Sequence, residues 1–230
     1  MNPKKISLLL ILLLLPAGLL LQPSSGRAFD TAACHCFRHR DYDPKAPFAA
    51  DDYLLATSFN SLSAAYFKIS KKQLIIYKMK SGIPQDDLLI ALYLARTQHL
   101  DLDKLLAARA REKSWVKVIK TIPALQNNDQ DPLLAKLRDN RPAAECEAYV
   151  ADHMIADFYG LSPAAVAAQR DRGLNEKELA LLFFLSRTRK IPPEKLIEQV
   201  RKGGRSWSEV AFYLGLTPKE VGQGILAFQK

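Results

Sequence analysis

An internal repeat constrains the fold of this chain more than any other feature of its sequence. Residues 88–97 (Leu-Leu-Ile-Ala-Leu-Tyr-Leu-Ala-Arg-Thr) align without gaps on residues 179–188 (Leu-Ala-Leu-Leu-Phe-Phe-Leu-Ser-Arg-Thr), at an offset of 91 positions. One residue is inserted further along, after which the Ser-Trp pair at 114–115 aligns with the Ser-Trp pair at 206–207. Each copy spans roughly 60 residues, a length that suits several short helices.

Both copies carry the pattern of buried helices. Apolar residues are so dense in 86–97 and 176–188 that we expect each segment to be a helix covered on most sides. Prolines stand where the first turn of a helix would begin, at Pro84, Pro163, Pro193 and Pro218. The apolar–polar alternation of strands is absent. The sequence therefore predicts an all-α fold with two tandem copies of a roughly 60-residue multi-helix module.

The chain divides into five predicted segments. They are a signal peptide at 1–28, an N-terminal Cys/His arm at 29–50, a first helical repeat at 51–122, a linker at 123–142 and a second helical repeat at 143–230. The run Asn-Asn-Asp-Gln-Asp-Pro indicates the linker. The density of apolar residues in both copies favours one shared core over two separate domains.

The first 28 residues have the layout of a secretory signal. Lys4 and Lys5 precede an apolar run at 6–21, and small residues at Gly26 and Ala28 suit a cleavage site. The run is 16 residues long and is interrupted by Pro-Ala-Gly, whereas a spanning helix needs about 20 apolar residues. We therefore expect a periplasmic or extracellular protein with no transmembrane anchor after cleavage.

The charge of the chain favours anionic partners only mildly. The full sequence has a net charge of +9, and removal of 1–28 takes away three basic residues and no acidic ones, which leaves +6. Acidic residues are interleaved with the basic ones, so the charge does not form a nucleic-acid patch. The expected partner is an unknown protein or an anionic component of the envelope.

The repeat contains corners with helix-turn-helix spacing. Segments 156–166 and 211–221 both read Ala, three residues, Gly, five residues, Val, with the glycines at Gly160 and Gly215. Glycine makes the tight turn, and the spacing reports a way of packing two helices. The second helices carry few side chains that could read bases, and an exported protein does not meet the chromosome. DNA binding is the alternative if the signal peptide is misread.

Three outcomes are open for the cysteines: a metal site, a disulfide, and a free or intermolecular thiol. Cys34, Cys36 and His39 cluster in the arm and are possible ligands for zinc or another thiophilic metal. In an oxidising compartment, a disulfide from Cys34 or Cys36 to Cys146 would instead tie the arm to the second repeat. Apart from that metal alternative, no cofactor is expected.

Four side chains recur at equivalent positions of the two copies. A tryptophan that recurs, as at Trp115 and Trp207, is typical of a core anchor. Arg96 and Arg187 suit capping of the preceding helix or pairing with an acid of the same copy. We interpret them, with the two turn glycines, as structural anchors. The sequence contains no His-Glu-x-x-His and no Gly-x-Ser-x-Gly motif, and it identifies no reaction.

The phrase that begins at Gly204 also carries a resemblance. It reads Gly-Arg-Ser-Trp-Ser-Glu-Val-Ala-Phe-Tyr-Leu-Gly and resembles the Gly-x-x-Trp-x-x-Val-Ala-x-x-x-Gly phrase of uncharacterised exported bacterial helical-repeat proteins. The first copy departs from the phrase at Lys68 and at 119–121. The resemblance implies a helical fold and an exported protein, and it implies no active site.

Together these features favour an exported, non-catalytic envelope protein that acts as a helical scaffold or interaction module. The first alternative is a metal-binding or thiol-redox protein built around Cys34–His39. The second alternative is a DNA-binding helix-turn-helix protein.

Overall fold

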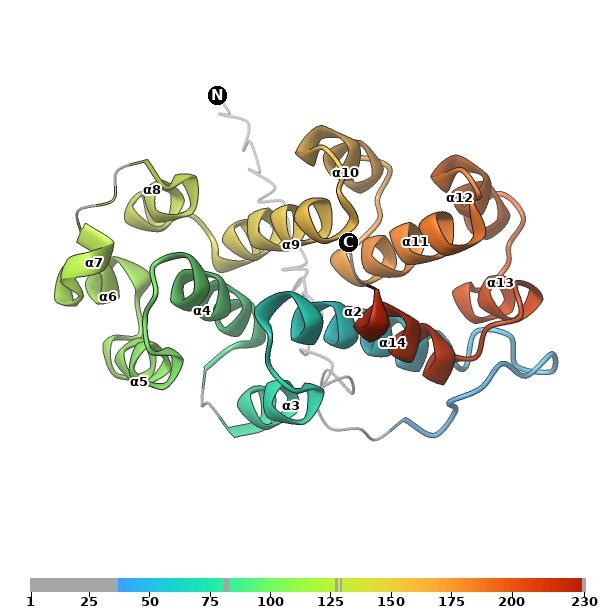
Figure 1. The fold of residues 1–230 in the computed structure, drawn as a ribbon, viewed down its shortest axis with the longest axis horizontal. Helices are drawn as coiled ribbons and strands as arrows, with labels where there is room; N and C mark the ends of the chain where they lie inside the picture. The colour runs from blue at the N-terminus through green and yellow to red at the C-terminus, as the bar shows by residue number, and fades with distance from the viewer. Residues whose placement is uncertain (1–36, 81–82, 127, 129, 229–230) are drawn as a thin grey trace, which may run out of the picture. The chain divides into compact units, whose positions relative to one another are not determined.

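The computed structural model describes residues 37–80, 83–126, 128 and 130–228. Throughout these residues the regular structure is helical, so the predicted all-α class is confirmed (Figure 1). The helices are α2 (Asp51–Phe67), α3 (Lys71–Lys80), α4 (Gln85–Thr97), α5 (Leu102–Glu112), α6 (Trp115–Thr121), α7 (Pro123–Gln126), α8 (Pro132–Arg138), α9 (Ala143–Tyr159), α10 (Pro163–Arg170), α11 (Glu176–Arg189), α12 (Pro193–Arg201), α13 (Trp207–Tyr213) and α14 (Pro218–Ala227).

Local sequence sets where several of these helices begin. Helices α11 and α14 start with a capping box, formed by Asn175 with Glu178 and by Thr217 with Glu220. In each box a side chain at the N-cap accepts a backbone N–H that has no partner inside the helix, and the glutamate accepts the N–H of the cap residue. Proline occupies the first turn of α10, α12 and α14, where its missing N–H costs no hydrogen bond.

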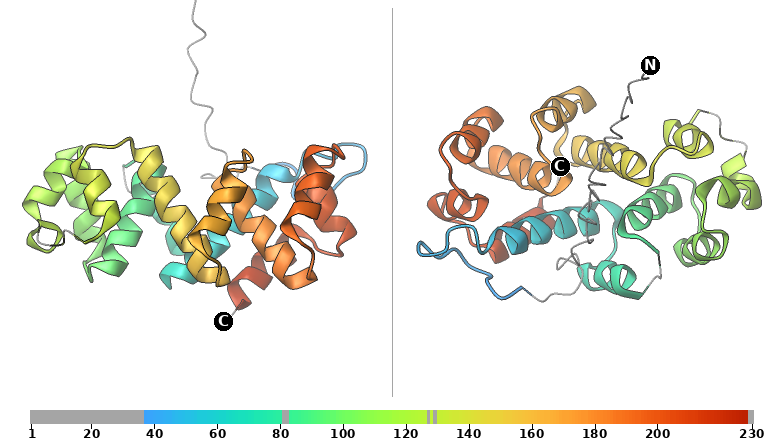
Figure 2. Two further views of the ribbon diagram at one scale, coloured as in Figure 1. Left: turned by 90° about the horizontal axis from the view of Figure 1, so that it is seen from above. Right: turned by 180° about the vertical axis from the view of Figure 1, so that it is seen from behind.

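We define the two halves of the molecule as residues 51–122 and 143–228. Helices α2 and α9, the first helices of these halves, each pack against helices of the other half. Each of the two helices is 17 residues long. Helix α2 packs mainly against α14 and α11 of the second half, and α9 packs mainly against α4 of the first half (Figures 1 and 2). The first helix of each half therefore lies against the central helix of the other half.

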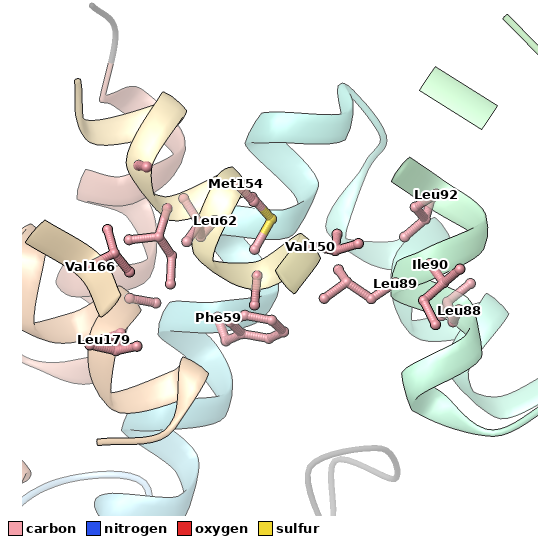
Figure 3. Close-up of a cluster of buried hydrophobic side chains, with 14 of the residues drawn as sticks. Phe59, Leu62, Leu88, Leu89, Ile90, Leu92, Val150, Met154, Val166 and Leu179 are labelled. Carbon is pink, nitrogen blue, oxygen red and sulfur yellow. The ribbon is translucent and has the colours of Figure 1, made fainter. Parts of the chain in front are cut away.

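Because α2 and α9 each pack against the other half, the two halves share a single hydrophobic core. Val150 and Met154 of α9 are fully buried and lie between side chains of α4 on one side and Phe59 and Leu62 of α2 on the other (Figure 3). The buried apolar side chains of both halves belong to one continuous cluster. The described residues accordingly form one compact unit.

Small side chains bring α2 and α14 close together. A Cβ added at Gly222 of α14 would lie 2.7 Å from Cγ2 of Thr57 and 3.2 Å from Oγ of Ser61, both on α2. Because a real Cβ does not tolerate such a distance, glycine is required for this approach of the two helices. The buried face of α2 is correspondingly rich in small residues.

The segment 123–142, expected to be a linker, contains the two short helices α7 and α8. Leu125 of α7 and Leu133 and Leu134 of α8 are fully buried. The side chain of Asp131 accepts the backbone N–H of Leu133 at 2.8 Å and so caps α8. The polar run thus ends in an N-cap, and the leucines that follow it contribute to the shared core.

The N-terminal predictions fall on residues that the structure does not describe. The proposed signal peptide, Cys34 and Cys36 all lie within 1–36. Among the residues that are described, none of the helices combines the length and apolar character that a membrane crossing requires.

Candidate functional site

A buried tryptophan in each half is bound to an acidic residue. In the second half, Nε1 of Trp207 donates to Oε1 of Glu178 at 2.9 Å, and Nη2 of Arg201 lies 3.5 Å from the same oxygen. These residues belong to α13, α11 and α12. One carboxylate therefore connects three helices, and its charge is balanced by an arginine.

The first half contains the same three kinds of residue in contact. Nε1 of Trp115 donates to Oδ1 of Asp87, and Nη2 of Arg109 lies 2.7 Å from Oδ2 of Asp87. The guanidinium of Arg109 also lies over the Trp115 ring, 5.7 Å from its centroid. Asp87 is fully buried, so its charge depends on these two partners. We call the two groups the Trp115 cluster and the Trp207 cluster.

Arg96 and Arg187, which occupy aligned positions, contact the C-terminal ends of α2 and α9. Arg96 donates to the carbonyl oxygen of Tyr66, near the end of α2. Arg187 donates to the carbonyl of Tyr159 and, at 3.1 Å, to that of Gly160, at the end of α9. Carbonyls at the C-terminus of a helix have no partner inside the helix, so each arginine satisfies exposed acceptors.

The turn glycines adopt the backbone conformation that their role requires. Gly160 caps α9 with φ of +63°, and Gly215 follows α13 with φ of +70°. Both values lie in the left-handed region, which glycine enters without steric cost.

An acidic side chain from the first half lies beside the Trp207 cluster. Asp51, the first residue of α2, accepts the backbone N–H of Trp207 at 3.1 Å and that of Ser208 at 2.8 Å. Oγ of Ser208 donates to the carbonyl of Pro47 at 2.9 Å. Burial raises the pKa of Asp51, although the hydrogen bonds from Ser208 and Trp207 act in the opposite direction. A carboxylate thus occupies this position and joins α2 to α13.

A pocket of about 320 Å³ lies beside the Trp115 cluster. Its wall includes Ala143, which is the first residue of α9 as Asp51 is the first residue of α2. The other lining residues come from α5, α6, α8 and the segments between them: Arg109, Lys113, Ser114, Trp115, Leu137, Asn140, Arg141 and Pro142.

The charged residues of this pocket are basic. Arg109 is paired with Asp87, and Nε of Arg141 donates to Oε2 of Glu145 at 2.9 Å. Lys113 has no ion pair with any described residue, and the buried Nε–H of Arg109 has no acceptor among them. The pocket therefore carries net positive charge beside an apolar wall.

The hydroxyl groups of the two aligned serines differ in their contacts. Oγ of Ser206 accepts the backbone N–H of Glu209 at 3.0 Å, as an N-cap does. Ser114 precedes α6 and makes no such bond. Ser114 is one of the residues that line the pocket.

The predicted metal and disulfide residues are only partly described. His39 is exposed, and Cys34 and Cys36 lie outside the described residues. Cys146 is buried and forms no disulfide with a described residue, and burial raises its pKa. Within the described ranges no three His, Cys, Asp or Glu side chains gather as a metal site would require. The metal site and the disulfide stay predictions.

Sequence reasoning missed the acids and arginines that complete the two clusters. Asp87 and Glu178 align at the same offset of 91 as the central helices, and Arg109 and Arg201 align at an offset of 92, which places the inserted residue before Arg201. A search for conserved charge between the copies could have found them. The pocket has no such signal, because its wall includes Lys113 and Ala143, which differ from the aligned residues Arg205 and Asp51.

Comparison of the chain with protein-family models, with curated proteins and with solved structures found no match.

Proposed function

We propose that this is an exported, non-catalytic helical-repeat protein that acts by binding a partner. The observation that carries the proposal is the pair of Trp–acid–Arg clusters. In both, the recurring polar side chains bind one another and hold three helices together. Polar groups used in this way build a rigid frame, and a rigid frame is what a binding protein needs in order to present a surface.

The proposal includes the tandem duplication. Helices α4, α5 and α6 have counterparts of similar order and contact in α11, α12 and α13. Helices α2 and α9 have equal lengths, and each accepts an arginine from the central helix of its own half at its C-terminal end. These agreements in helix order, helix length and arginine contacts support the proposed duplication.

The proposed compartment is the periplasm or the extracellular space. It is supported by Lys4 and Lys5, the apolar run and the small residues at Gly26 and Ala28. The proposed partner is a protein or an anionic component of the envelope, in keeping with the net positive charge of the chain from Phe29 onward.

The intact mass of the protein after native purification tests export. We expect a chain that begins at Phe29, recovered outside the cytoplasm. As a control, Leu13→Arg places a charge in the centre of the apolar run, and this variant is expected to stay in the cytoplasm with Met1 retained. Recovery of an uncleaved wild-type chain from the cytoplasm would overturn the proposed compartment. A bound zinc ion in the native mass would favour the Cys34–His39 alternative instead.

A further inference from the structure

We propose that the pocket beside Trp115 binds a small molecule through a carboxylate group. The inference rests on the proposed duplication, because it compares the two halves position by position. In the second half the corresponding place is filled from within the chain by the carboxylate of Asp51. Beside the Trp115 cluster of the first half, the residue at the start of α9 is Ala143, whose methyl group leaves the pocket open.

A second internal anion is also missing from the first half. Arg205 of the second half lies 3.6 Å from Glu209, so its charge is balanced. By the alignment, Lys113 corresponds to Arg205 and Lys117 corresponds to Glu209. The Trp115 cluster thus keeps a cation at Lys113. The acids Asp51 and Glu209 are replaced there by Ala143 and Lys117. An anion supplied from outside would restore the charge balance of the second half.

The pocket offers the donors that a carboxylate requires. Lys113 has no ion pair with a described residue, and Arg109 and Arg141 add two further cationic groups to the wall. The hydroxyl of Ser114 is not used as a helix cap. Hydrogen bonds from cationic donors to a carboxylate are roughly twice as strong as neutral ones, so a carboxylate gains more here than an uncharged amide of the same shape.

The size and wall of the pocket define the rest of the ligand. A volume of about 320 Å³ lies at the lower end of the range of small-molecule pockets, roughly 300–1,000 Å³, so a small organic acid fits. Trp115, Leu137 and Pro142 form apolar wall and suit a short hydrocarbon group beside the carboxylate.

Isobutyrate and isobutyramide provide a matched pair of probes, because they differ mainly in charge. Titrated into the ¹⁵N-labelled protein, isobutyrate is expected to shift the indole N–H signal of Trp115 in a saturable manner. The indole of Trp207 serves as an internal control and is expected to stay in place. Equal shifts with isobutyramide, no saturable shift with isobutyrate, or a stronger response to inorganic phosphate would each overturn the assignment.

Two substitutions test the residues. Lys113→Gln is expected to weaken isobutyrate binding several-fold, whereas Lys219→Gln, at an exposed lysine of α14, is expected to leave it unchanged. Ala143→Asp supplies an internal carboxylate and is expected to abolish isobutyrate binding. The NMR spectrum of this variant is expected to remain that of a folded protein. Unchanged affinity in Lys113→Gln would overturn the proposal.

The reciprocal substitution, Asp51→Ala, keeps the proposal testable if Ala143→Asp does not fold. Asp51→Ala empties the corresponding position of the second half, and isobutyrate is then expected to shift the Trp207 indole and to recover part of the lost thermal stability. Absence of both effects would contradict the correspondence of the two positions. Export is read from the mass measurement alone, so failure of the pocket and failure of the proposed compartment are distinguishable.

Discussion

At the scale of single residues, the two carboxylates of the tryptophan clusters differ in their access to water. Asp87 is fully buried, whereas the side chain of Glu178 is 12% exposed. Glu178 also accepts the backbone N–H of Asn175 at 3.0 Å through its other oxygen. Loss of the tryptophan N–H should therefore destabilise the first half more than the second. The carboxylate of Glu178 can accept a hydrogen bond from water in its place, whereas that of Asp87 cannot.

Substitution of each tryptophan by phenylalanine measures this difference. Trp115→Phe keeps most of the apolar volume but leaves an oxygen of Asp87 without its donor, and we expect a loss of about 1–3 kcal/mol in the free energy of unfolding. Trp207→Phe is the matched control and should lose less. Urea unfolding followed by circular dichroism measures both. A larger loss for Trp207→Phe would contradict the interpretation of Asp87 as the more dependent acid.

Sequence alone identified the tryptophans as anchors but not the acids that bind them. Asp87 stands in the first turn of α4, where an acidic residue is favoured by the helix dipole whether or not it is buried. Its burial is decided by α5 and α6, which fold back over it, and no local pattern carries that information. The same limit applies to the pocket, whose wall is assembled from residues 109–115 and 137–143.

At the scale of helices, the contact between α2 and α14 depends on the absence of a side chain at Gly222. This contact joins the first and the last helix of the described chain. Its closeness follows from small residues on both helices, with Thr57 and Ser61 facing the glycine.

Gly222→Ala is expected to destabilise the protein. Alanine is favoured over glycine within a helix by roughly 1 kcal/mol. The added methyl group would, however, overlap Cγ2 of Thr57, and overpacking of a core costs about 1–3 kcal/mol. Thermal unfolding should therefore show a lower Tm. Thr57→Ser removes the overlapping methyl group and should restore part of the loss in the double variant.

An exposed position on the same helix provides the control for that experiment. Gln223→Ala, next along the chain, changes helix preference without steric overlap and should leave Tm unchanged or slightly raised. A Gly222→Ala variant as stable as wild type would show that α2 and α14 separate easily.

The helices themselves were largely predictable, because their signals are local. Asn175 with Glu178 and Thr217 with Glu220 have the spacing of a capping box, and the apolar runs behind them are dense. The pairing of α2 with α14 was not predictable, since it joins residues more than 150 positions apart. The short helices α7 and α8 were missed because the polar run between them is typical of a linker.

At the scale of the whole molecule, one acidic group lies where helices of both halves meet. Glu147 of α9 is partly buried, and its pKa is raised to about 7, mainly by that burial. Glu176 of α11 and Asp86 of α4 contribute to this rise, while Lys78 and Lys177 oppose it. The protonation of this residue is therefore linked to the stability of the shared core.

The sign of that linkage gives a pH dependence. In the unfolded chain the pKa of Glu147 returns to its ordinary value of 4.5, so the folded state binds the proton more tightly. The stabilising contribution is complete below pH 4.5 and is lost as the pH rises through about 7. Glu147→Gln should flatten the decline of stability between these values, measured as Tm against pH.

Glu198→Gln is the control for this titration, since the side chain of Glu198 is 59% exposed. Its profile should follow that of the wild-type protein. If Glu147→Gln instead kept the full decline between the two pH values, the dependence would have another source.

The packing of α2 against helices of the second half determines when the fold can be completed during synthesis. During synthesis α2 emerges early, but its main partners α11 and α14 end near residue 227, at the other end of the chain. Contacts between segments so distant in sequence form slowly, since a long loop must first close. The packing of α2 against α14 therefore cannot be completed until the last described helix has left the ribosome. Under the proposed export, this delay would leave the chain incompletely folded while it crosses a translocation channel.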